Sequence, residues 1–431
     1  MSDYERTAVP RDARRGFWQI TSVWVGYVFI LVSMMAGAGM AAGMPLDTLF
    51  WAILVGNLFL TIVSSLMSII AYKTGYTFAL ICRFSFGSLG AKIPAIMYAF
   101  IQLGWYVIQA ALFGHLIAVY FELSPFFEAL AMIGSCLFMG LFALKGMRWM
   151  SVVGLVSIPT MIMLCLATAM RSIQDGGGWT TVAAFSGEET VSFMTAVGLV
   201  LGTWIFGAST TVADFNRFAR STKHVIAGCA TGLLIVNSFI IGVGAIVGAA
   251  SQQWDLVEIL FGLGLVVPAF VLLTTNLWTT NSANLYSVGL TLSSVFPTVS
   301  RQTIMVGIMI LASVLSLFKP YEIGAVFGML TGLSIIVPPL TGIVLVDFYY
   351  LWHKQYPDHI ESLSFKTINP YAILAWLAGI GVALAIDIGF ASLNAMLGAA
   401  LLYALIMKAS HLKMLNSSDD HLVTHQKTQE A

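Results

Sequence analysis

The chain has 431 residues, of which 58% are hydrophobic and only 9% are charged, and its formal net charge is zero. A soluble domain carries about 25% charged residues, so this composition predicts an integral membrane protein and excludes a basic nucleic-acid-binding domain. The four cysteines lack CxxC spacing, which favours buried thiols over a metal or disulfide site.

Apolar stretches of about 20 residues recur along the chain and predict transmembrane helices rather than the short alternating strands of a barrel. Residues 1–19 form a polar N-terminal segment that we expect to be retained, and residues 409–431 form a polar tail that we expect to be disordered. Twelve spans are predicted, at residues 20–43, 48–71, 93–120, 126–144, 150–171, 191–212, 224–248, 257–286, 302–318, 322–348, 369–388 and 391–408.

The positive charges predict the orientation of these spans. With the N-terminus inside the cell, 18 of the 20 lysines and arginines fall in inner segments, and only Arg171 and Lys319 lie outside. Lys and Arg concentrate on the cytoplasmic side of membrane proteins. We therefore expect a multi-pass protein of the plasma (inner) membrane with both termini in the cytoplasm.

Two spans contain runs of small residues at matching places. Residues 35–43 lie in the first span and residues 202–211 in the sixth, and these spans open two successive sets of five. Glycine runs allow tight helix packing, but interrupted helices at corresponding positions are typical of inverted-repeat transporters with a site at the membrane midplane. We expect helices 1 and 6 to be discontinuous in one transporter domain, 20–408, with a first repeat at 20–171, an inverted second repeat at 191–348 and two additional helices at 369–408.

The eighth span contains an unusually polar stretch. Residues 276–287 carry seven hydrogen-bonding side chains besides Trp278 and Tyr286, and no charge. Such groups need partners inside a membrane, so they must face protein, a ligand or a wet cavity. We interpret this stretch as half of a transport site.

Several motifs together resemble the bacterial cytosine permease branch of nucleobase–cation symporter family 1, over about residues 9–408. They are Val9-Pro10-x-x-Ala13-Arg14-Arg15-Gly16, Gly56-Asn57-Leu58, Lys73-Thr74-Gly75, Arg83-Phe84-Ser85-Phe86-Gly87, Gln102-x-Gly104-Trp105, Ala213-Asp214-Phe215-x-Arg217-Phe218, Asn276-x-Trp278-Thr279-Thr280-Asn281 and Pro338-Pro339-x-x-Gly342-x-x-x-x-Asp347. The resemblance implies an all-α, leucine-transporter-type fold of five-plus-five helices with two more at the C-terminus. It also implies uptake of a flat, neutral heterocycle driven by Na⁺ or H⁺.

The resemblance places the substrate ring between Trp105 and Trp204, although either indole alone is also compatible with a packed core residue. Gln102 and Gln109 lie three residues before and four after Trp105, so all three share a helix face. A glutamine offers a donor and an acceptor to one edge of a base. Gln102 fits the cytosine-permease pattern, whereas Gln109 resembles a hydantoin-type transporter or serves helix–helix hydrogen bonding.

Asn281 and Asn284 from the eighth span, and Ser209 from the sixth, are expected to meet the polar edge of the substrate. Phe206 departs from the cytosine-permease pattern, because it stands at the site where the resemblance leads us to expect serine. We expect cytosine as the substrate, with hydroxymethylpyrimidine, a hydantoin or a purine as alternatives.

The resemblance also implies a Na⁺ site, with the hydroxyls of Thr279 and Thr280, the carbonyl of Asn276 and the backbone carbonyls near Gly26 and Phe29 as ligands. Oxygen ligands without a carboxylate suit a weakly held monovalent ion that must leave again. Threonines of a helix also bond back to the preceding turn, which is the alternative for this pair. Proton coupling would need a titratable group at the site; His115 is a candidate, but a core histidine with satisfied partners explains it too.

No catalytic residue or cofactor is expected, and no oligomer is required. An embedded enzyme would need a cluster of His, Asp and Glu, or a nucleophile with a base, and the sequence groups none. A channel would need a repeated pore loop or a charged ring.

Overall fold

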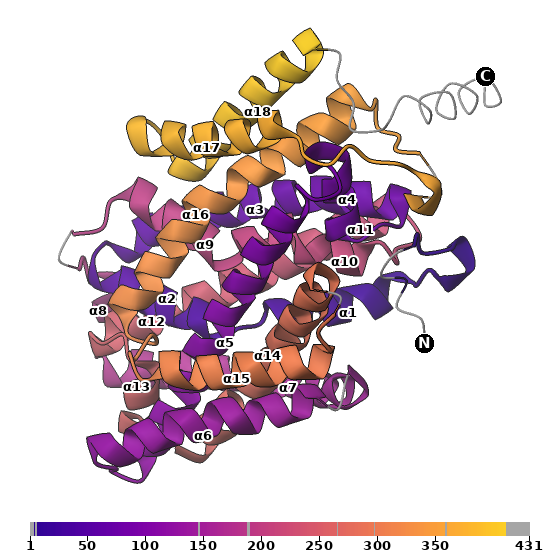
Figure 1. The fold of residues 1–431 in the computed structure, drawn as a ribbon. Helices are drawn as coiled ribbons and strands as arrows, with labels where there is room; N and C mark the ends of the chain where they lie inside the picture. Colours follow the sequence, from indigo (N-terminus) through magenta and orange to yellow (C-terminus); the bar gives the residue numbers. More distant parts are fainter. Residues whose placement is uncertain are drawn as a thin grey trace.

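The computed structural model describes residue 4 and residues 7–144, 147–187, 190–264, 266–296, 298–357 and 360–410. These residues form helices and connecting loops, and the one β-bridge among them joins Arg15 to Ala219 (Figure 1).

The first half of the chain folds into η1 (Arg11–Ala13), α1 (Phe17–Val28), α2 (Leu31–Ala42), α3 (Leu46–Thr74), α4 (Phe78–Phe86), α5 (Lys92–Tyr120), α6 (Pro125–Leu144), α7 (Met147–Asp175) and α8 (Trp179–Ala183). The second half folds into α9 (Phe193–Ser209), α10 (Thr211–Asn216), α11 (Thr222–Cys229), the π-helical η2 (Ala230–Asn237), α12 (Ser238–Ser251), α13 (Leu256–Gly262), α14 (Val266–Val295), α15 (Arg301–Ser316), α16 (Ile323–Val346), the π-helical η3 (Asp347–Leu351), η4 (Ile360–Ser362), α17 (Pro370–Ala385) and α18 (Ala391–Ser410).

Within the described ranges, six helices or joined helices are long and apolar enough to cross a membrane, and the pair α1 and α2 makes a seventh. Three shorter apolar helices, in α6, α15 and α17, accompany them. These helices fit a multi-pass membrane protein, and the count of twelve spans stays a prediction.

The eighth predicted span begins close to where α13 begins, but the structure divides it into two helices and extends it. The chain turns after α13, where Gly264 has a φ of +73°, and α14 then runs nine residues beyond the predicted end at residue 286. A positive φ suits glycine, which has no Cβ to clash with the backbone. Apolar residues on both sides of this turn concealed it in the sequence.

The first span is broken, but not where the small residues stand. Helices α1 and α2 meet at an angle of 48° across the two-residue break at Phe29 and Ile30. The small residues instead let α2 pack tightly on α12: a Cβ on Gly37 would overlap the carbonyl oxygen of Ile241, and one on Gly244 would overlap that of Met34. The tight-packing interpretation of residues 35–43 is therefore the correct one.

The interruption in the sixth span is a single residue. Thr210, with φ −127° and ψ −71°, separates α9 from α10, and its hydroxyl donates to the carbonyl oxygen of Phe206 over 2.7 Å. It lies inside the stretch that the small residues indicated, but α9 and α10 continue as one apolar span of 24 residues.

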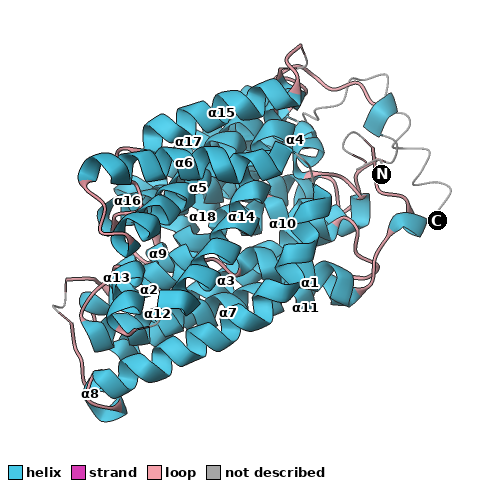
Figure 2. Cartoon of the chain, turned by 90° about the horizontal axis from the view of Figure 1, so that it is seen from below, coloured by secondary structure: helices cyan, strands magenta, loops and turns pink. Residues whose placement is uncertain are grey.

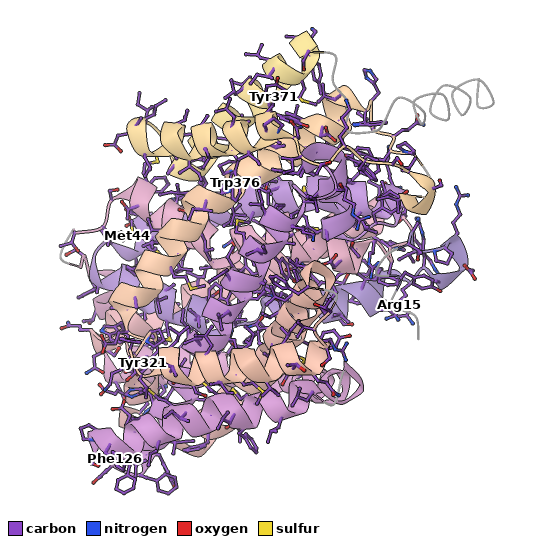
Figure 3. The ribbon with its side chains drawn as sticks, in the orientation of Figure 1. Arg15, Met44, Phe126, Tyr321, Tyr371 and Trp376 are labelled. Atoms are coloured by element: carbon purple, nitrogen blue, oxygen red, sulfur yellow. The ribbon has the colours of Figure 1, made fainter. Side chains whose placement is uncertain are left out.

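The bundle has two distinct ends (Figure 2). Helices α1, α4, α10 and α11 gather at one end, and α8 and α13 at the other. Arg15 lies at the first end, whereas Met44, Phe126 and Tyr321 lie at the second (Figure 3). Between the ends, α5 packs on α14, and α9 packs on both α3 and α16. These contacts hold α1, α5, α9 and α14 around one interior space.

Candidate functional site

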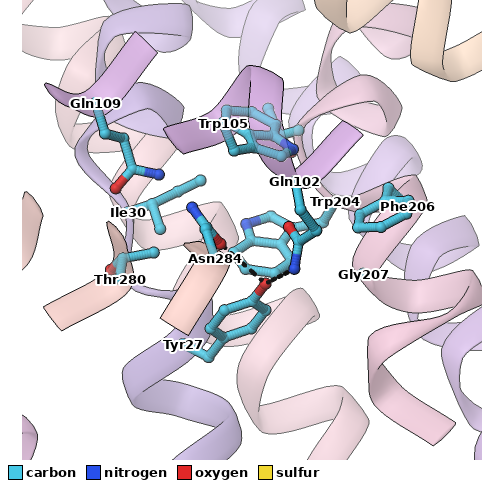
Figure 4. Close-up of a pocket in the computed structure, with 11 residues that line it drawn as sticks. Tyr27, Ile30, Gln102, Trp105, Gln109, Trp204, Phe206, Gly207, Thr280 and Asn284 are labelled. Atoms are coloured by element: carbon cyan, nitrogen blue, oxygen red, sulfur yellow. Dashed lines mark hydrogen bonds between the residues drawn. The ribbon is translucent and has the colours of Figure 1, made fainter. Parts of the chain in front are cut away.

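A pocket lies in this interior space, beside the break between α1 and α2 (Figure 4). Side chains or backbone of the following residues line it: Tyr27, Ile30, Gln102, Trp105, Gln109, Thr203, Trp204, Phe206, Gly207, Thr280 and Asn284. They come from α1 and its break, α5, α9 and α14. Among these described lining residues there is no carboxylate and no imidazole.

Helix α5 supplies one wall. Gln102, Trp105 and Gln109 share a face of this helix, as their spacing predicted, and are only 1%, 6% and 1% exposed. Each amide points into the pocket with the indole between them (Figure 4). One helical stripe thus offers an aromatic plate and two amide groups to the same ligand.

Helix α9 supplies the opposite wall, through Trp204 and Phe206. The Trp204 ring lies edge-on to Trp24 and Tyr27, with ring centroids 5.8 Å and 5.3 Å away. Gly207 makes room for this indole, because an added Cβ would lie 2.6 Å from Cε3 of Trp204. Gly207 lies in the stretch where we expected the helix to break, but it instead leaves space for the Trp204 ring.

The polar side chains of the pocket are connected through Tyr27. Its hydroxyl accepts a hydrogen bond from Nε2 of Gln102 over 3.2 Å and donates one to Oδ1 of Asn284 over 3.4 Å. The same Nε2 also donates to the Tyr98 hydroxyl over 3.4 Å. Residues of α1, α5 and α14 therefore share one hydrogen-bond chain at the pocket wall.

Four polar atoms of the pocket have no hydrogen-bond partner among the described residues: Oε1 of Gln102, Oε1 of Gln109, Nε1 of Trp204 and Nδ2 of Asn284. A buried polar group without a partner costs about 1–3 kcal/mol. Two acceptors and two donors left open around one pocket indicate that a polar ligand completes them.

Two predicted substrate residues are not brought to the pocket. Asn281 is fully buried, and its Nδ2 donates to the backbone oxygen of Tyr106 over 2.9 Å. Ser209 is also buried, at the end of α9, and does not line the pocket. Asn281 and Asn284 are three residues apart and so lie on neighbouring parts of one helix face, but Asn281 is taken up by the backbone of α5 while Asn284 lines the pocket.

Three lining side chains were missed by sequence reasoning: Tyr27, Ile30 and Thr203. Thr203 stands directly beside Trp204, so its place next to a predicted site residue was an available signal. Tyr27 and Ile30 flank the helix break, and their role could be inferred only once that break was located.

The predicted cation ligands fall in three groups. Thr280 lines the pocket near Ile30, at the α1–α2 break. Phe29 forms that break and is fully buried, and Gly26 lies one turn before it in α1. The side chains of Asn276 and Thr279 lie outside the described part of the structure, although the backbone of α14 passes through both.

A bundle of apolar helices, with a bent first span and a pocket lined by aromatic and amide side chains at its centre, defines an α-helical membrane protein. The family model described as permease for cytosine/purines, uracil, thiamine, allantoin matches residues 8–406. The chain therefore belongs to this family of permeases, as the sequence motifs had indicated.

Known proteins agree with this assignment. The chain is 30% identical over 406 residues to the cytosine permease of Escherichia coli strain K12, covering 94% of both chains. It is 25% identical over 427 residues to the hydantoin permease of Microbacterium maritypicum, covering 91% of this chain and 84% of that one. The inward-facing structure of Mhp1 superposes with a TM-score of 0.81 at 19% identity, over 94% of this chain and 95% of that one, which shows a shared fold of the leucine-transporter type.

Proposed function

We propose that this protein is a secondary active symporter that imports a neutral, planar nucleobase together with a monovalent cation by alternating access. Its single strongest support is the closed pocket with two indoles and four unpaired polar atoms, and no charged group among the described lining residues. An uncharged ring with several polar edge atoms matches the polarity of such a pocket, which must widen to admit the ring. Cytosine is the first candidate, because the cytosine permease of Escherichia coli is 30% identical over nearly the whole chain.

The proposed substrate ring stacks between Trp105 and Trp204, with Phe206 beside it. The edge of the ring then bonds to Gln102 and Asn284, and Gln109 extends the polar wall toward the α1–α2 break. The hydantoin permease relative makes a hydantoin the second candidate. Both kinds of ligand carry adjacent amide-like donors and acceptors.

The proposed coupling ion is Na⁺, held by the hydroxyl of Thr280 and by backbone carbonyls at the end of α1, with Asn276 and Thr279 as further ligands. A helix that ends inside the membrane leaves carbonyl groups without helical partners, and such groups coordinate cations. The lack of a carboxylate or an imidazole among the described lining residues supports Na⁺ over H⁺ as the ion.

The proposed setting is the inner membrane, with both ends of the chain in the cytoplasm. The proposed working parts are the repeats at 20–171 and 191–348, which alternate the access to the pocket, and the two additional helices at 369–408. The end of the bundle with α1, α4, α10 and α11 then faces the cytoplasm.

A binding panel tests this function. Purified protein is titrated with cytosine, uracil, adenine, hypoxanthine, hydantoin and hydroxymethylpyrimidine, each in Na⁺ and in choline, by isothermal calorimetry or thermal shift. We expect one or a few of these heterocycles to bind, and more tightly in Na⁺. Equal affinity in choline would reject Na⁺ coupling, and no binding by any member would reject the substrate class. Saturable uptake of the bound compound in cells lacking their own permeases, driven by the ion gradient, separates a symporter from a channel.

A further inference from the structure

We propose that Tyr27 is a positioning residue that fixes the donor–acceptor polarity of the pocket, so that Gln102 presents an acceptor and Asn284 presents a donor to the bound ligand. This inference rests on the proposed function and adds a rule for which bases the site accepts.

The polarity of each amide follows from the number of hydrogens that the amide and hydroxyl groups can donate. The amide nitrogen of Gln102 carries two, and the hydroxyl oxygens of Tyr27 and Tyr98 lie 3.2 Å and 3.4 Å from it. Both donors of that amide are therefore used by the protein, and only Oε1, which has no partner among the described residues, is left for the ligand.

The Tyr27 hydroxyl has one hydrogen and gives it to Oδ1 of Asn284 over 3.4 Å. This contact leaves Nδ2 of Asn284 as the unpaired atom of the second amide. Because one hydroxyl can donate to only one of two amides, the other amide must donate to the hydroxyl. The two amides are thus coupled and present opposite polarity to the pocket.

Neighbouring side chains hold the Gln102–Tyr27–Asn284 hydrogen-bond chain in place. The Tyr27 ring packs against three aromatic rings, those of Trp24, Trp204 and Phe215, with centroids 6.2 Å, 5.3 Å and 5.8 Å away. Gln102 and Asn284 are only 1% and 2% exposed, so bulk water does not compete for their amides. Turning Gln102 over would place two acceptor oxygens beside the single hydroxyl hydrogen, and turning Asn284 over would take away the acceptor of that hydrogen, so either change breaks the present hydrogen-bond chain.

The Gln102–Tyr27–Asn284 hydrogen-bond chain therefore discriminates between bases of equal shape whose donors and acceptors are exchanged. Cytosine has an acceptor at N3 and a donor at its exocyclic amine, whereas uracil has a donor at N3 and an acceptor oxygen at the same place, so in one ring orientation between the two indoles only one of these bases pairs with both amides. Adenine and hypoxanthine differ in the same way on a larger ring. A site built to hydrogen-bond one arrangement rejects the other, because its own buried groups are then left unpaired.

The test compares Kd values for both pairs, cytosine with uracil and adenine with hypoxanthine, in the parent and in Tyr27→Phe. In the pair that binds, we expect the parent to separate the two members by at least about tenfold. Tyr27→Phe removes the single hydroxyl, frees both amides to turn, and is expected to bring that ratio at least about fivefold closer to one. A role in folding alone would weaken both members equally and leave the ratio unchanged, which would overturn the inference.

Tyr106→Phe is the matched control. It deletes a buried hydroxyl of the same helix as Gln102 that donates to the backbone oxygen of Cys136 and to neither amide, so the ratio should stay within about twofold of the parent. An equal loss of selectivity in this variant would also overturn the inference. If Tyr27→Phe does not fold, Asn284→Ser replaces the amide with a hydroxyl that serves as donor or acceptor, and the ratio should fall in the same way. If no base binds the parent, the proposed function fails and the inference with it; binding with an unchanged ratio defeats the inference alone.

Discussion

At the scale of single residues, the site depends on Trp105 and Trp204, which belong to two different helices and are 6% and 4% exposed. Both indoles face the interior pocket and not the outer surface of the bundle, where tryptophans of membrane interfaces lie. The spacing within α5 predicted which residues accompany Trp105, since neighbours on one helix face are a local property. The spacing could not predict Tyr27, which meets Gln102 only after α1 and α5 pack together.

Removing the Trp105 ring should weaken ligand binding without unfolding the protein. Stacking of a base on an aromatic side chain contributes about 1–3 kcal/mol, so Trp105→Ala is expected to raise Kd roughly 5- to 150-fold. Trp51→Ala is the control, because that indole is 64% exposed on the outer surface of α3. Calorimetry measures both, and a Kd unchanged in Trp105→Ala would contradict the stacking arrangement.

Thr280 is the residue that tests the cation site. Thr280→Ala removes a hydroxyl at the pocket wall next to the α1–α2 break. We expect the concentration of Na⁺ that gives half-maximal substrate binding to rise at least about tenfold, while substrate affinity at saturating Na⁺ changes little. Thr231→Ala is the control. It removes a hydroxyl outside α14 that donates to the carbonyl oxygen of Ala227 one turn earlier, and it should leave both quantities unchanged. Loss of substrate affinity at every Na⁺ concentration would instead place Thr280 at the substrate.

At the scale of helices, hydropathy predicted where the spans lie but not how they break. The 48° bend falls at Phe29 and Ile30, two bulky apolar residues that carry no breaking signal in the sequence. The glycines of α2 serve its contact with α12, and the turn before α14 is hidden in an apolar run. Breaks of this kind are set by tertiary packing, which supplies new partners for the freed backbone groups. The polar stretch in α14 was readable because polar groups in a membrane need partners, yet only the fold decides that Asn284 faces the pocket and Asn281 faces α5.

The α2–α12 contact makes a prediction about stability. In Gly244→Ala the new methyl would meet the backbone oxygen of Met34, which cannot move without shifting α2. Overpacking of this kind costs typically about 1–3 kcal/mol, so we expect a clearly lower melting temperature in detergent. Gly242→Ala in the same helix is the control, since its nearest neighbour is the half-exposed Phe50 ring, 3.3 Å away. Equal melting temperatures for the two variants would show that the helices are not in such close contact.

At the scale of the whole molecule, the two ends of the bundle differ in their chemistry. At the end with α1 and α11, the backbone nitrogen of Arg15 bonds to the oxygen of Phe218 over 2.6 Å, and the N-terminal segment covers the α10–α11 loop. At the other end, His115 lies 3.1 Å from both Glu128 and Asp255, and Lys319 lies 2.8 Å from Glu128. His115 is thus a junction between α5, α6 and the loop before α13, away from the pocket-lining residues, which agrees with the structural alternative for this histidine.

The charge distribution predicts the orientation of the ends, and cysteine labelling tests it. The native cysteines should react little with the label, because all four are buried: Cys82, Cys136, Cys165 and Cys229. Thr180, in α8, and Lys223, in α11, are exposed at opposite ends of the bundle. We expect a membrane-impermeant maleimide to label Thr180→Cys in intact cells.

Lys223→Cys should react only after the cells are made permeable, because the basic end of the bundle is expected in the cytoplasm. The reverse pattern would invert the predicted membrane orientation and, with it, the direction of transport in the proposed function. Labelling of both variants in permeable cells confirms that each cysteine is reachable, so that a missing signal in intact cells reports the side of the membrane and not burial. If the pocket opens away from the end that contains Arg15, the orientation then decides whether it opens to the outer or to the inner solution.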